Sequence, residues 1–310
     1  MAAEAELLAD GGAAALAPEF FRSREFLGAE GATHTLRAGP AAIPLIVRDD
    51  LPGGLRDAIS PYGYPGATID GGGSSVDPSG IEWSASGLVS AFIRDRVGAE
   101  ASLARATARS MVQVHDPSRP RRLRPRLAEQ IRALSRAGWE VAVGTGPETT
   151  ESERGAFHRA YTETMRRAGA AERYLFPREY FDAILGFDRS WLLLARSPAG
   201  EPGAGAIAAL SDGLLHYYLG GTADEHLAAS PFKNVTAAML DLADVLEVPL
   251  NLGGGVQAGD GLERFKRGFA NSELPFWTHE LVCDPDAYER LAAGRDADDF
   301  FPAYRAPARA

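Results

Sequence analysis

The sequence has 310 residues, a formal net charge of −10 at pH 7 and 45% hydrophobic residues, which is typical of a globular protein. This length permits one large domain or two medium ones. Cys283 is the only cysteine, which excludes a disulfide framework and a cysteine-rich zinc site. The acidic balance argues against tight nonspecific binding of nucleic acid, but it is compatible with a local basic patch.

We expect neither a signal peptide nor a membrane span. Residues 1–17 are rich in alanine and acidic, without the basic start and the apolar run of a signal peptide. No stretch approaches the roughly 18–20 apolar residues that a membrane-spanning helix needs. The sequence therefore predicts a cytoplasmic protein.

The first half combines short predicted elements with loops. Apolar patterning predicts a short helix or a turn at 20–27, strands at 33–37 and 42–47, an amphipathic helix at 82–95 and a strand at 107–114. We expect the N-terminal residues before these elements to be loose.

A run of arginines, RPRRLRPR at 119–126, precedes a predicted helix at 127–136 and a strand at 139–143. Two interpretations stay open: a solvated start of the helix, or a contact with phosphate or an RNA backbone. The candidate residues are Arg119, Arg121, Arg122, Arg124 and Arg126.

The second half has a clearer order of elements. Helices are predicted at 151–168 and 177–186, followed by strands at 191–196, 205–210 and 214–220. The segment GTGPETTES at 144–152 is the best candidate boundary, which divides the chain into domains 1–147 and 148–310.

Ser230 and Pro231 predict the start of the next helix, with Ser230 as its cap and Pro231 at its first position. Lys233 and Asn234 follow in the first turn of this helix. They are candidates for holding a phosphate at the helix N-terminus, and ordinary capping is the alternative.

The stretch PLNLGGGVQAGDGLERFKRGF at 249–269 predicts a strand, a glycine turn and a short helix. Gly253, Gly254 and Gly255 allow positive φ and a close approach of the backbone, which suits a turn that lines a substrate or a merely tight connection. Lys266 is predicted to lie off the packed face of the helix, beside Phe265. It is one of only two lysines among 32 Lys and Arg residues.

Five segments of the second half are informative together: FHRAYTETMRRAGAAERYLFPREYF at 157–181, HYYLGGT at 216–222, SPFKNVTAAML at 230–240, LNLGGG at 250–255 and RFKRGF at 264–269. With these segments, the order of elements, a mixed sheet covered by helices, resembles the GNAT acyltransferase fold, and its repetition in two units resembles the Fem family of aminoacyl-tRNA-dependent transferases. This resemblance implies an α/β protein of two GNAT-like units, of which the C-terminal one is better defined.

The resemblance also implies a reaction. In the family, a Phe-Lys pair lies beside the centre of acyl transfer, and this pair matches Phe265 and Lys266 here. The implied enzyme transfers an aminoacyl group from charged tRNA to an amine acceptor, which can be a peptide, a cell-wall precursor or a small metabolite, and it needs no cofactor beyond this co-substrate. A fixed cation suits such a reaction, because negative charge develops on the carbonyl oxygen.

Further candidates complete the predicted site. Tyr62 and Tyr64 lie in PYGYPG at 61–66, which is similar to the family's Y-x-P-R-G-P segment. It has no arginine between Pro65 and Gly66, and this difference argues against a peptidoglycan precursor as the acceptor. The two tyrosines are candidates for an acceptor pocket, although paired aromatic residues in such turns usually pack. Two loop carboxylates and two strand residues follow. Asp70 and Asp77 are candidates for the base that takes the amine proton, and His216 and Tyr218 for substrate contacts or packing.

Three functions stay open at this point. The segment GTADEHLAAS at 221–230 lacks the R/Q-x-x-G-x-G/A pattern of a GNAT pyrophosphate loop, which favours a tRNA donor over acyl-CoA. An acyl-CoA-dependent N-acyltransferase is the alternative, and a GNAT-like protein that binds a ligand without turnover is the third. The six histidines show no metal-ligand spacing, so we predict no metal.

Overall fold

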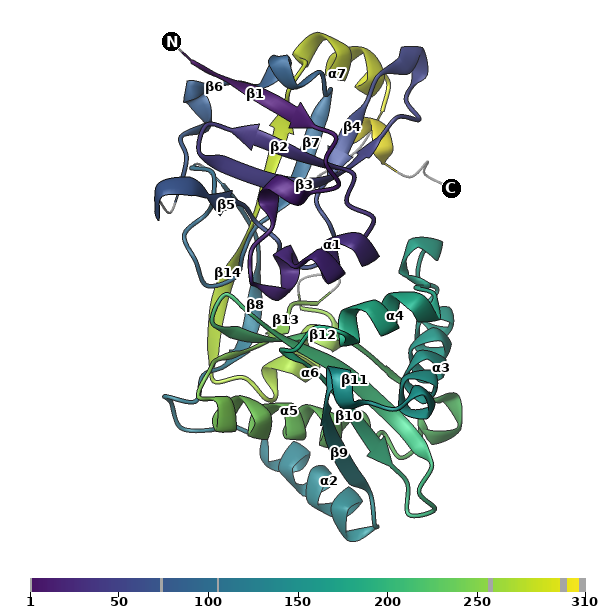
Figure 1. Cartoon of the computed structure of the whole chain (residues 1–310). Coiled ribbons are helices and arrows are strands. Elements are labelled where there is room, and N and C mark those ends of the chain that lie inside the picture. The colour runs from purple at the N-terminus through teal and green to yellow at the C-terminus, as the bar shows by residue number, and fades with distance from the viewer. Residues whose placement is uncertain (1, 73–74, 105, 256–258, 296–299, 307–310) are drawn as a thin grey trace. The chain divides into compact units, whose positions relative to one another are not determined.

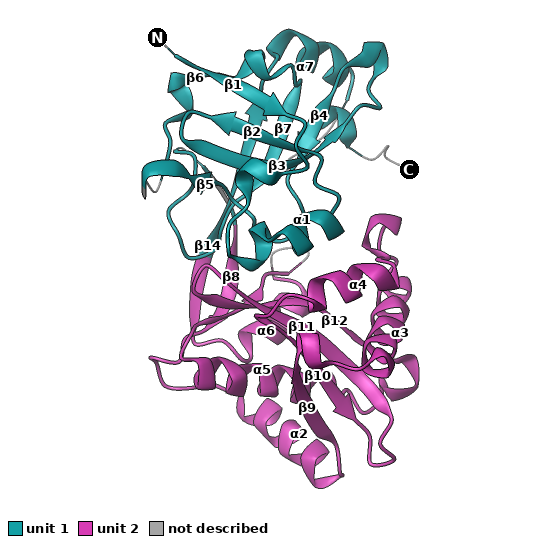
Figure 2. Ribbon diagram, viewed as in Figure 1, with its two compact units in different colours: residues 1–109, 275–310 teal, residues 110–274 magenta. Residues whose placement is uncertain are grey.

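The computed structural model describes residues 2–72, 75–104, 106–255, 259–295 and 300–306. The chain forms two compact units: residues 1–109 and 275–310 make up unit 1, and residues 110–274 make up unit 2 (Figure 2). The two crossings between units lie within strands β8 (Thr107–His115) and β14 (Ser272–Val282). Unit 1 is therefore built from both ends of the chain.

The sheet of unit 1 has the strand order β6-β1-β2-β3-β4-β7-β14, and β5 pairs with β3. Strand pairs β1–β6 and β4–β7 are parallel, whereas β1–β2, β2–β3, β3–β4 and β7–β14 are antiparallel. The short helices are α1 (Arg24–Ala29) and α7 (Pro285–Ala292). The strands are β1 (Ala3–Leu8), β2 (His34–Ala38), β3 (Ala41–Arg48), β4 (Asp57–Ile59), β5 (Thr68–Ile69), β6 (Ile81–Glu82) and β7 (Ser90–Arg94).

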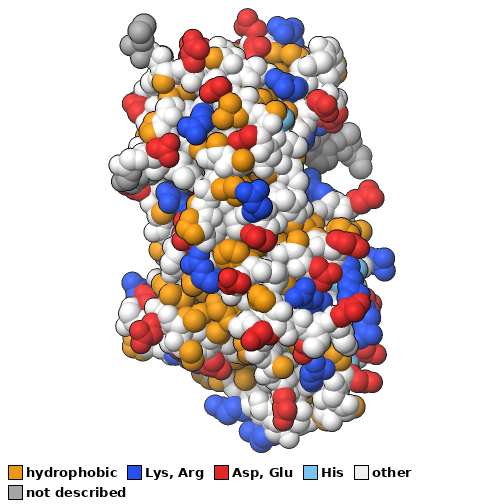
Figure 3. Space-filling model, viewed as in Figure 1, with side chains coloured by type: hydrophobic (Ala, Val, Ile, Leu, Met, Phe, Trp, Pro, Cys, Tyr) orange, Lys and Arg blue, Asp and Glu red, His pale blue; other side chains and the backbone are white. Residues whose placement is uncertain are grey.

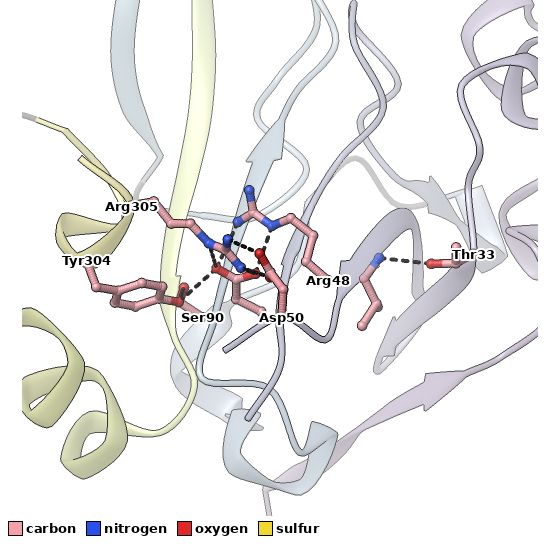
Figure 4. A network of polar contacts seen from close by, with 8 residues as sticks. Thr33, Arg48, Asp50, Ser90, Tyr304 and Arg305 are labelled. Atoms are coloured by element: carbon pink, nitrogen blue, oxygen red, sulfur yellow. Dashed lines mark hydrogen bonds and ion pairs between the residues drawn. The ribbon is translucent and has the colours of Figure 1, made fainter. Parts of the chain in front are cut away.

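A buried carboxylate fixes the C-terminal segment to the sheet of unit 1. Asp57 is 0% exposed and binds Arg48 through two hydrogen bonds of 2.8 Å (Figure 4). Arg305 binds the same carboxylate through two hydrogen bonds of 2.9 Å, and the Tyr304 hydroxyl donates to it at 3.1 Å. The charge of Asp57 is thus compensated by two arginines from distant parts of the chain.

The sheet of unit 2 has the strand order β8-β13-β12-β11-β10-β9. Only the pair β12–β13 is parallel; the other described pairs are antiparallel. The strands are β9 (Glu140–Thr145), β10 (Ser190–Arg196), β11 (Pro202–Ser211), β12 (Leu214–Thr222) and β13 (Leu250–Gly253). The helices are α2 (Pro125–Arg136), α3 (Glu151–Arg167), α4 (Arg178–Leu185), α5 (Phe232–Leu246) and α6 (Gly261–Arg267).

Helices cover both faces of the unit 2 sheet (Figure 1). Helix α5 packs on one face through Val235, Met239 and Leu240, and α2 adds its apolar stripe against α5. Helices α3 and α4 lie on the other face, where Phe157, Tyr161 and Phe181 are buried. The predicted fold class is confirmed: the chain is an α/β protein with mixed sheets in two units.

The expected domain boundary at 147 and 148 lies inside unit 2. It falls between β9 and α3, and β9 forms six register pairs with β10, from Thr145 to Glu140. This pairing ties the residues before 147 to those after it. The observed division between units therefore differs from the expected domain boundary.

The expected helix at 82–95 is wrong. The segment begins in β6, continues through a 3₁₀ turn at Trp83–Ser86 and ends in β7. Gly87 has a left-handed φ of 68° that stops the turn. After it, buried Ala91 and Ile93 alternate with partly exposed Phe92, and β7 pairs with β14 and β4. A period of two rather than 3.6 thus governs these residues.

Further elements were not expected, among them β4, β5, β1 and α7. The N-terminal residues, expected to be loose, form β1, which pairs with β2 over Ala5–Leu8. Helix α7 follows β14 and is capped by the Asp284 carboxylate. Among the described residues, none of the helices has the length and hydropathy that crossing a bilayer requires.

Candidate functional site

The parallel strands β12 and β13 of unit 2 separate soon after they meet. They pair only at Leu215 with Leu250 and at His216 with Asn251. Strand β12 then continues to Thr222 with β11 as its partner, and an extra residue at Tyr218 interrupts that ladder. Beyond His216 no described register pair joins β12 to β13.

Helix α6 follows β13 and carries the predicted Phe-Lys pair. The Asp260 carboxylate caps the helix by accepting from the Glu263 N–H at 2.7 Å. Phe265 packs against Phe269 with ring centroids 5.2 Å apart and against Phe232 of α5 at 6.3 Å. These aromatic contacts fix the rotation of α6 on the core of unit 2.

Lys266 is 9% exposed, although its place beside Phe265 predicted a position off the packed face. Its ammonium donates a hydrogen bond of 2.8 Å to the Gly254 carbonyl and lies 5.5 Å from the centre of the Tyr217 ring. Burial lowers the pKa of Lys266 from 10.5 to about 8, against the opposing charge of Asp260. The ammonium is thus charged near neutral pH and is held between β12 and the glycine turn.

The glycine turn is ordered by a buried chain of side-chain hydrogen bonds. Gly253 has a φ of 78°, and its N–H donates to the Asn251 side-chain oxygen at 2.8 Å. The Asn251 amide donates to Nδ1 of His216 at 3.1 Å, which leaves Nε2–H of His216 to donate to the Ser211 carbonyl at 3.2 Å. Gly254 follows with its carbonyl toward Lys266, and Gly255 is exposed.

His216 is neutral in this chain of hydrogen bonds. Burial lowers its pKa from 6.5 to about 4, and the hydrogen bond to Ser211 offsets only part of this effect. The Tyr218 hydroxyl bonds to the hydroxyl of Tyr180 in α4. The two predicted substrate residues therefore lie in different surroundings: His216 supports the glycine turn, and Tyr218 contacts α4.

Helix α5 begins differently from the prediction. Pro231 is the N-cap, and Ser230 precedes it with a left-handed φ of 56°, without a side-chain cap. The Asn234 amide donates to the Ser135 hydroxyl of α2 at 3.2 Å. Burial and the nearby Arg126 lower the pKa of Lys233. Lys233 and Asn234 thus lie on the side of α5 that faces α2.

The predicted arginines of 119–126 divide into two groups. Arg121 pairs with Asp241 at 2.5 Å and with Asp244 at 3.5 Å, and Arg119 pairs with Asp116 at 3.2 Å. Arg122, Arg124 and Arg126 have no carboxylate within ion-pair distance in the described part of the chain. Arg124 donates instead to the Arg264 carbonyl at the end of α6, at 2.7 Å.

Four predicted residues lie in unit 1. Tyr64 packs edge-on between Phe21 and Phe276, with ring centroids 5.5 and 5.2 Å away, and Arg94 lies over the Tyr62 ring. Asp77 accepts from the Ser79 backbone and hydroxyl at 3.0 and 2.8 Å. Asp70 is exposed, and one carboxylate oxygen lies 3.8 Å from Arg37.

Two residues of the site were missed by sequence reasoning. Tyr217 supplies the ring beside the Lys266 ammonium, and Asn251 connects His216 to the glycine turn. An asparagine between two buried leucines, as in LNLGGG, is a signal that was available, because a buried amide requires hydrogen-bond partners. In the described residues, no three His, Cys, Asp or Glu side chains are grouped as metal ligands would be.

No protein-family model and no curated protein sequence matches this chain. Solved structures do match it. L-PGS from Bacillus licheniformis is 11% identical, with a TM-score of 0.56 over 84% of this chain and 87% of that one. FemX is 11% identical, with a TM-score of 0.54 over 83% and 89%.

A third match is the C-terminal domain of a putative lysylphosphatidylglycerol synthetase from Agrobacterium fabrum. It is 13% identical, with a TM-score of 0.56 over 85% of this chain and 87% of that one. These three matches extend over more than four fifths of the chain, and so over parts of both units. At such low identity they show a shared fold, and the resemblance expected from the sequence is confirmed at that level.

Proposed function

We propose that this protein, which has the fold of FemX and L-PGS, is an acyltransferase that forms an amide by moving an aminoacyl group from aminoacyl-tRNA to an amine. The observation that carries the proposal is the Lys266 ammonium, buried next to the point where β12 and β13 separate. A buried cation suits a site where a carbonyl becomes negatively charged.

The reaction requires a nucleophilic amine, an ester carbonyl, and groups that stabilise the negative oxygen and accept the proton of the amine. The neutral amine of the acceptor attacks the ester carbonyl of the aminoacyl group, so that a C–N bond forms and the oxygen becomes negative. The C–O bond to the terminal ribose then breaks, and the ribose oxygen takes up a proton while the amine loses one. This direct transfer needs no covalent enzyme intermediate.

Lys266 is arranged to stabilise the negative oxygen. The Gly254 carbonyl uses one of the three N–H groups of the ammonium, and no carboxylate forms an ion pair with Lys266 among the described residues. The Tyr217 ring lies within cation–π distance, and the site is screened from water by burial. A charge in such surroundings interacts more strongly with a developing anion than an exposed one does.

The basic segment supports an RNA donor. Arg122, Arg124 and Arg126 have no carboxylate partner in the described part of the chain, and tRNA offers phosphates to such side chains. In contrast, the loop before α5 carries Asp224 and Glu225, which pair with Arg167 and Arg159. Carboxylates at this position are unfavourable for the pyrophosphate of acyl-CoA.

The residues that we propose for the acceptor amine belong to unit 1. Tyr62 and Tyr64 stay our proposed acceptor residues. Asp70 is preferred over Asp77 as the base, because the Asp77 carboxylate already accepts from Ser79 twice. The acceptor amine itself is proposed only as a class: a peptide, a cell-wall precursor or a small metabolite.

The test uses the full chain with total tRNA charged with labelled amino acids and a panel of amines. The proposal expects labelled amides whose formation is abolished by ribonuclease and strongly reduced by Lys266→Met. Amide formation that requires acyl-CoA and releases a thiol would instead establish the acyl-CoA-dependent alternative. If no amine reacts with either donor, and Lys266→Met changes only ligand binding, the protein binds a ligand without turnover.

A further inference from the structure

A second candidate site lies in unit 2, where the segment after β8 meets the segment after α6. A cavity of about 730 Å³ opens there, a size typical of small-ligand sites. Its wall includes Arg119, Arg122, Arg124, Arg267 and the polar side chains of Gln113 and Glu273. The function proposed above uses Arg122 and Arg124 as contacts for tRNA phosphates, but it assigns no role to the cavity that they line or to Gln113.

Hydrogen bonds hold the two walls of the cavity in place. The Asn271 amide donates to the Asp116 carbonyl at 2.9 Å and accepts from the Asp116 N–H at 2.7 Å. The Arg124 N–H donates to the Gly268 carbonyl at 3.3 Å, and its guanidinium donates to the Arg264 carbonyl. One wall of the cavity is the segment 113–125 and the other is the segment 267–273. These hydrogen bonds therefore fix the arginines of the segment 113–125 against the other wall.

The cavity carries positive charge that the described part of the chain does not neutralise. Arg267 pairs with Glu263 and Glu273, and Arg119 pairs with Asp116. Arg122 and Arg124 have no described carboxylate partner. Two uncompensated guanidinium groups at one cavity favour a phosphate, whose oxygens they can bind in pairs.

A buried amide in the same wall requires a hydrogen-bond donor. Gln113 is 1% exposed, and its nitrogen donates to the Glu273 carboxylate at 2.8 Å, which fixes the orientation of the amide. The Gln113 oxygen has no hydrogen-bond partner among the described residues. A buried acceptor without a donor is rare in folded proteins, so this atom indicates a ligand with an O–H or N–H group.

We infer that this cavity binds a ribonucleotide phosphate, with Arg122 and Arg124 on the phosphate and the Gln113 oxygen accepting from a ribose hydroxyl. The phosphate can belong to an RNA strand or to a free nucleotide. Only the link to an RNA donor rests on the proposed function; the binding chemistry follows from the cavity itself. Binding is therefore tested separately from transfer.

The test measures the binding of a fluorescein-labelled hexaribonucleotide to the full chain by anisotropy, with AMP and inorganic phosphate as competitors. Loss of a charge-assisted contact in Arg122→Ala or Arg124→Ala is expected to weaken binding about tenfold or more. Each loss should also lower the slope of log K against log salt by about 0.7. Arg132→Ala, an exposed arginine of α2 outside the cavity wall, is the matched control and should change binding less than about twofold.

Gln113→Met provides the second readout. Wild-type protein should prefer the hexaribonucleotide to the same deoxy sequence, and this variant should lose the preference while it keeps the salt slope. Competition by AMP would identify a free nucleotide as a sufficient ligand, and no competition by AMP would identify an RNA strand. The inference is overturned if wild-type protein binds none of these probes, or if Arg122→Ala, Arg124→Ala and Arg132→Ala behave alike.

The experiments distinguish an error in this inference from an error in the proposed function. A protein that binds the probe but forms no amide keeps this inference and loses the proposed function. A protein that forms amides with Lys266-dependent rates but gains nothing from Arg122 or Arg124 keeps the function and loses this inference. Thermal melting of each variant shows whether the fold is retained.

Discussion

The Lys266 ammonium and the Gly254 carbonyl are joined by a hydrogen bond of 2.8 Å, which connects helix α6 to the turn after β13. The lysine is thus held by a neutral main-chain group and not by a carboxylate. A carboxylate partner would cancel most of the charge of the ammonium, whereas a carbonyl orients it and leaves the charge available. Figure 3 shows that basic and acidic side chains are interspersed on the visible face of the molecule.

Replacement of Lys266 tests this charge directly. Lys266→Met keeps much of the apolar stem and removes the ammonium, so the rate of transfer should fall about 100- to 1000-fold, as for the loss of one oxyanion donor. Single-turnover rates with charged tRNA measure the effect on the chemical step. Lys233→Met, which removes the only other lysine, is the control and should change the rate far less. Equal losses in both variants would contradict a special role for Lys266.

The pH dependence of transfer should report the ionisation of Lys266. Burial lowers its pKa from 10.5 to about 8, so the charged form is lost as the pH rises through 8. The rate is therefore expected to rise while the acceptor amine loses its proton and then to fall above pH 8. Lys266→Arg keeps a cation at all these pH values and should lose the falling limb, even at a lower maximal rate. A falling limb that persists in Lys266→Arg would assign it to another group.

Much of unit 2 was predictable because its elements are long and strongly patterned. The Thr150–Glu153 capping box marks the start of α3, and the apolar stripe of α5 gives a helical period. Unit 1 was less predictable because its strands are short and its sheet depends on distant segments. In the helix expected at 82–95, the apolar residues fit both the helical period of 3.6 and the strand period of two. Residues 90–94 form a strand because they pair with β14, almost 200 residues later.

The candidate site was predictable in its residue types but not in its connections. Lysine scarcity and the Phe-Lys pair made Lys266 the first candidate, yet its burial follows from Tyr217 and the glycine turn, which the sequence does not place beside it. The arginine run was likewise visible, whereas the separation of paired Arg121 from unpaired Arg122 depends on where α5 presents Asp241. Such pairings arise from tertiary packing and leave no local pattern.

Acid should destabilise the protein through His216. Its pKa is about 4 in the fold and 6.5 as an ordinary histidine, so the unfolded chain binds a proton between these pH values and the folded chain does not. Stability is therefore fully present above pH 6.5 and decreases as the pH falls toward 4, by about 3 kcal/mol in total. Urea unfolding between pH 7 and 4 measures this slope. His216→Gln should lower the stability at pH 7 yet flatten the slope, and an unchanged slope would contradict the prediction.

Loss of the Asp57 carboxylate should strongly destabilise unit 1. Asp57→Asn leaves Arg48 and Arg305 without the charge that both of them bind, at a cost of about 3–5 kcal/mol. Hydrogen exchange of β3 and β4 should show the loss. Asp50→Asn is the matched control, because Asp50 also binds Arg305 but its side chain is 65% exposed, and the expected loss is about 1 kcal/mol or less. Similar losses in the two variants would argue against the buried carboxylate as the main stabilising group.

Alanine variants of two neighbouring glycines distinguish the effect of backbone strain from the effect of an added side chain at the turn. Gly253 has a φ of 78°, which an alanine adopts at a cost of about 1–2 kcal/mol. Gly254 has no such φ, and a methyl group there would meet the Met111 carbonyl at 3.4 Å, an ordinary contact. Gly253→Ala should therefore lower both the stability and the rate of transfer, because the turn shifts the Gly254 carbonyl that holds Lys266. Gly254→Ala should be nearly neutral for stability in thermal melting, and the reverse order of the two variants would show that the turn does not set the position of the ammonium.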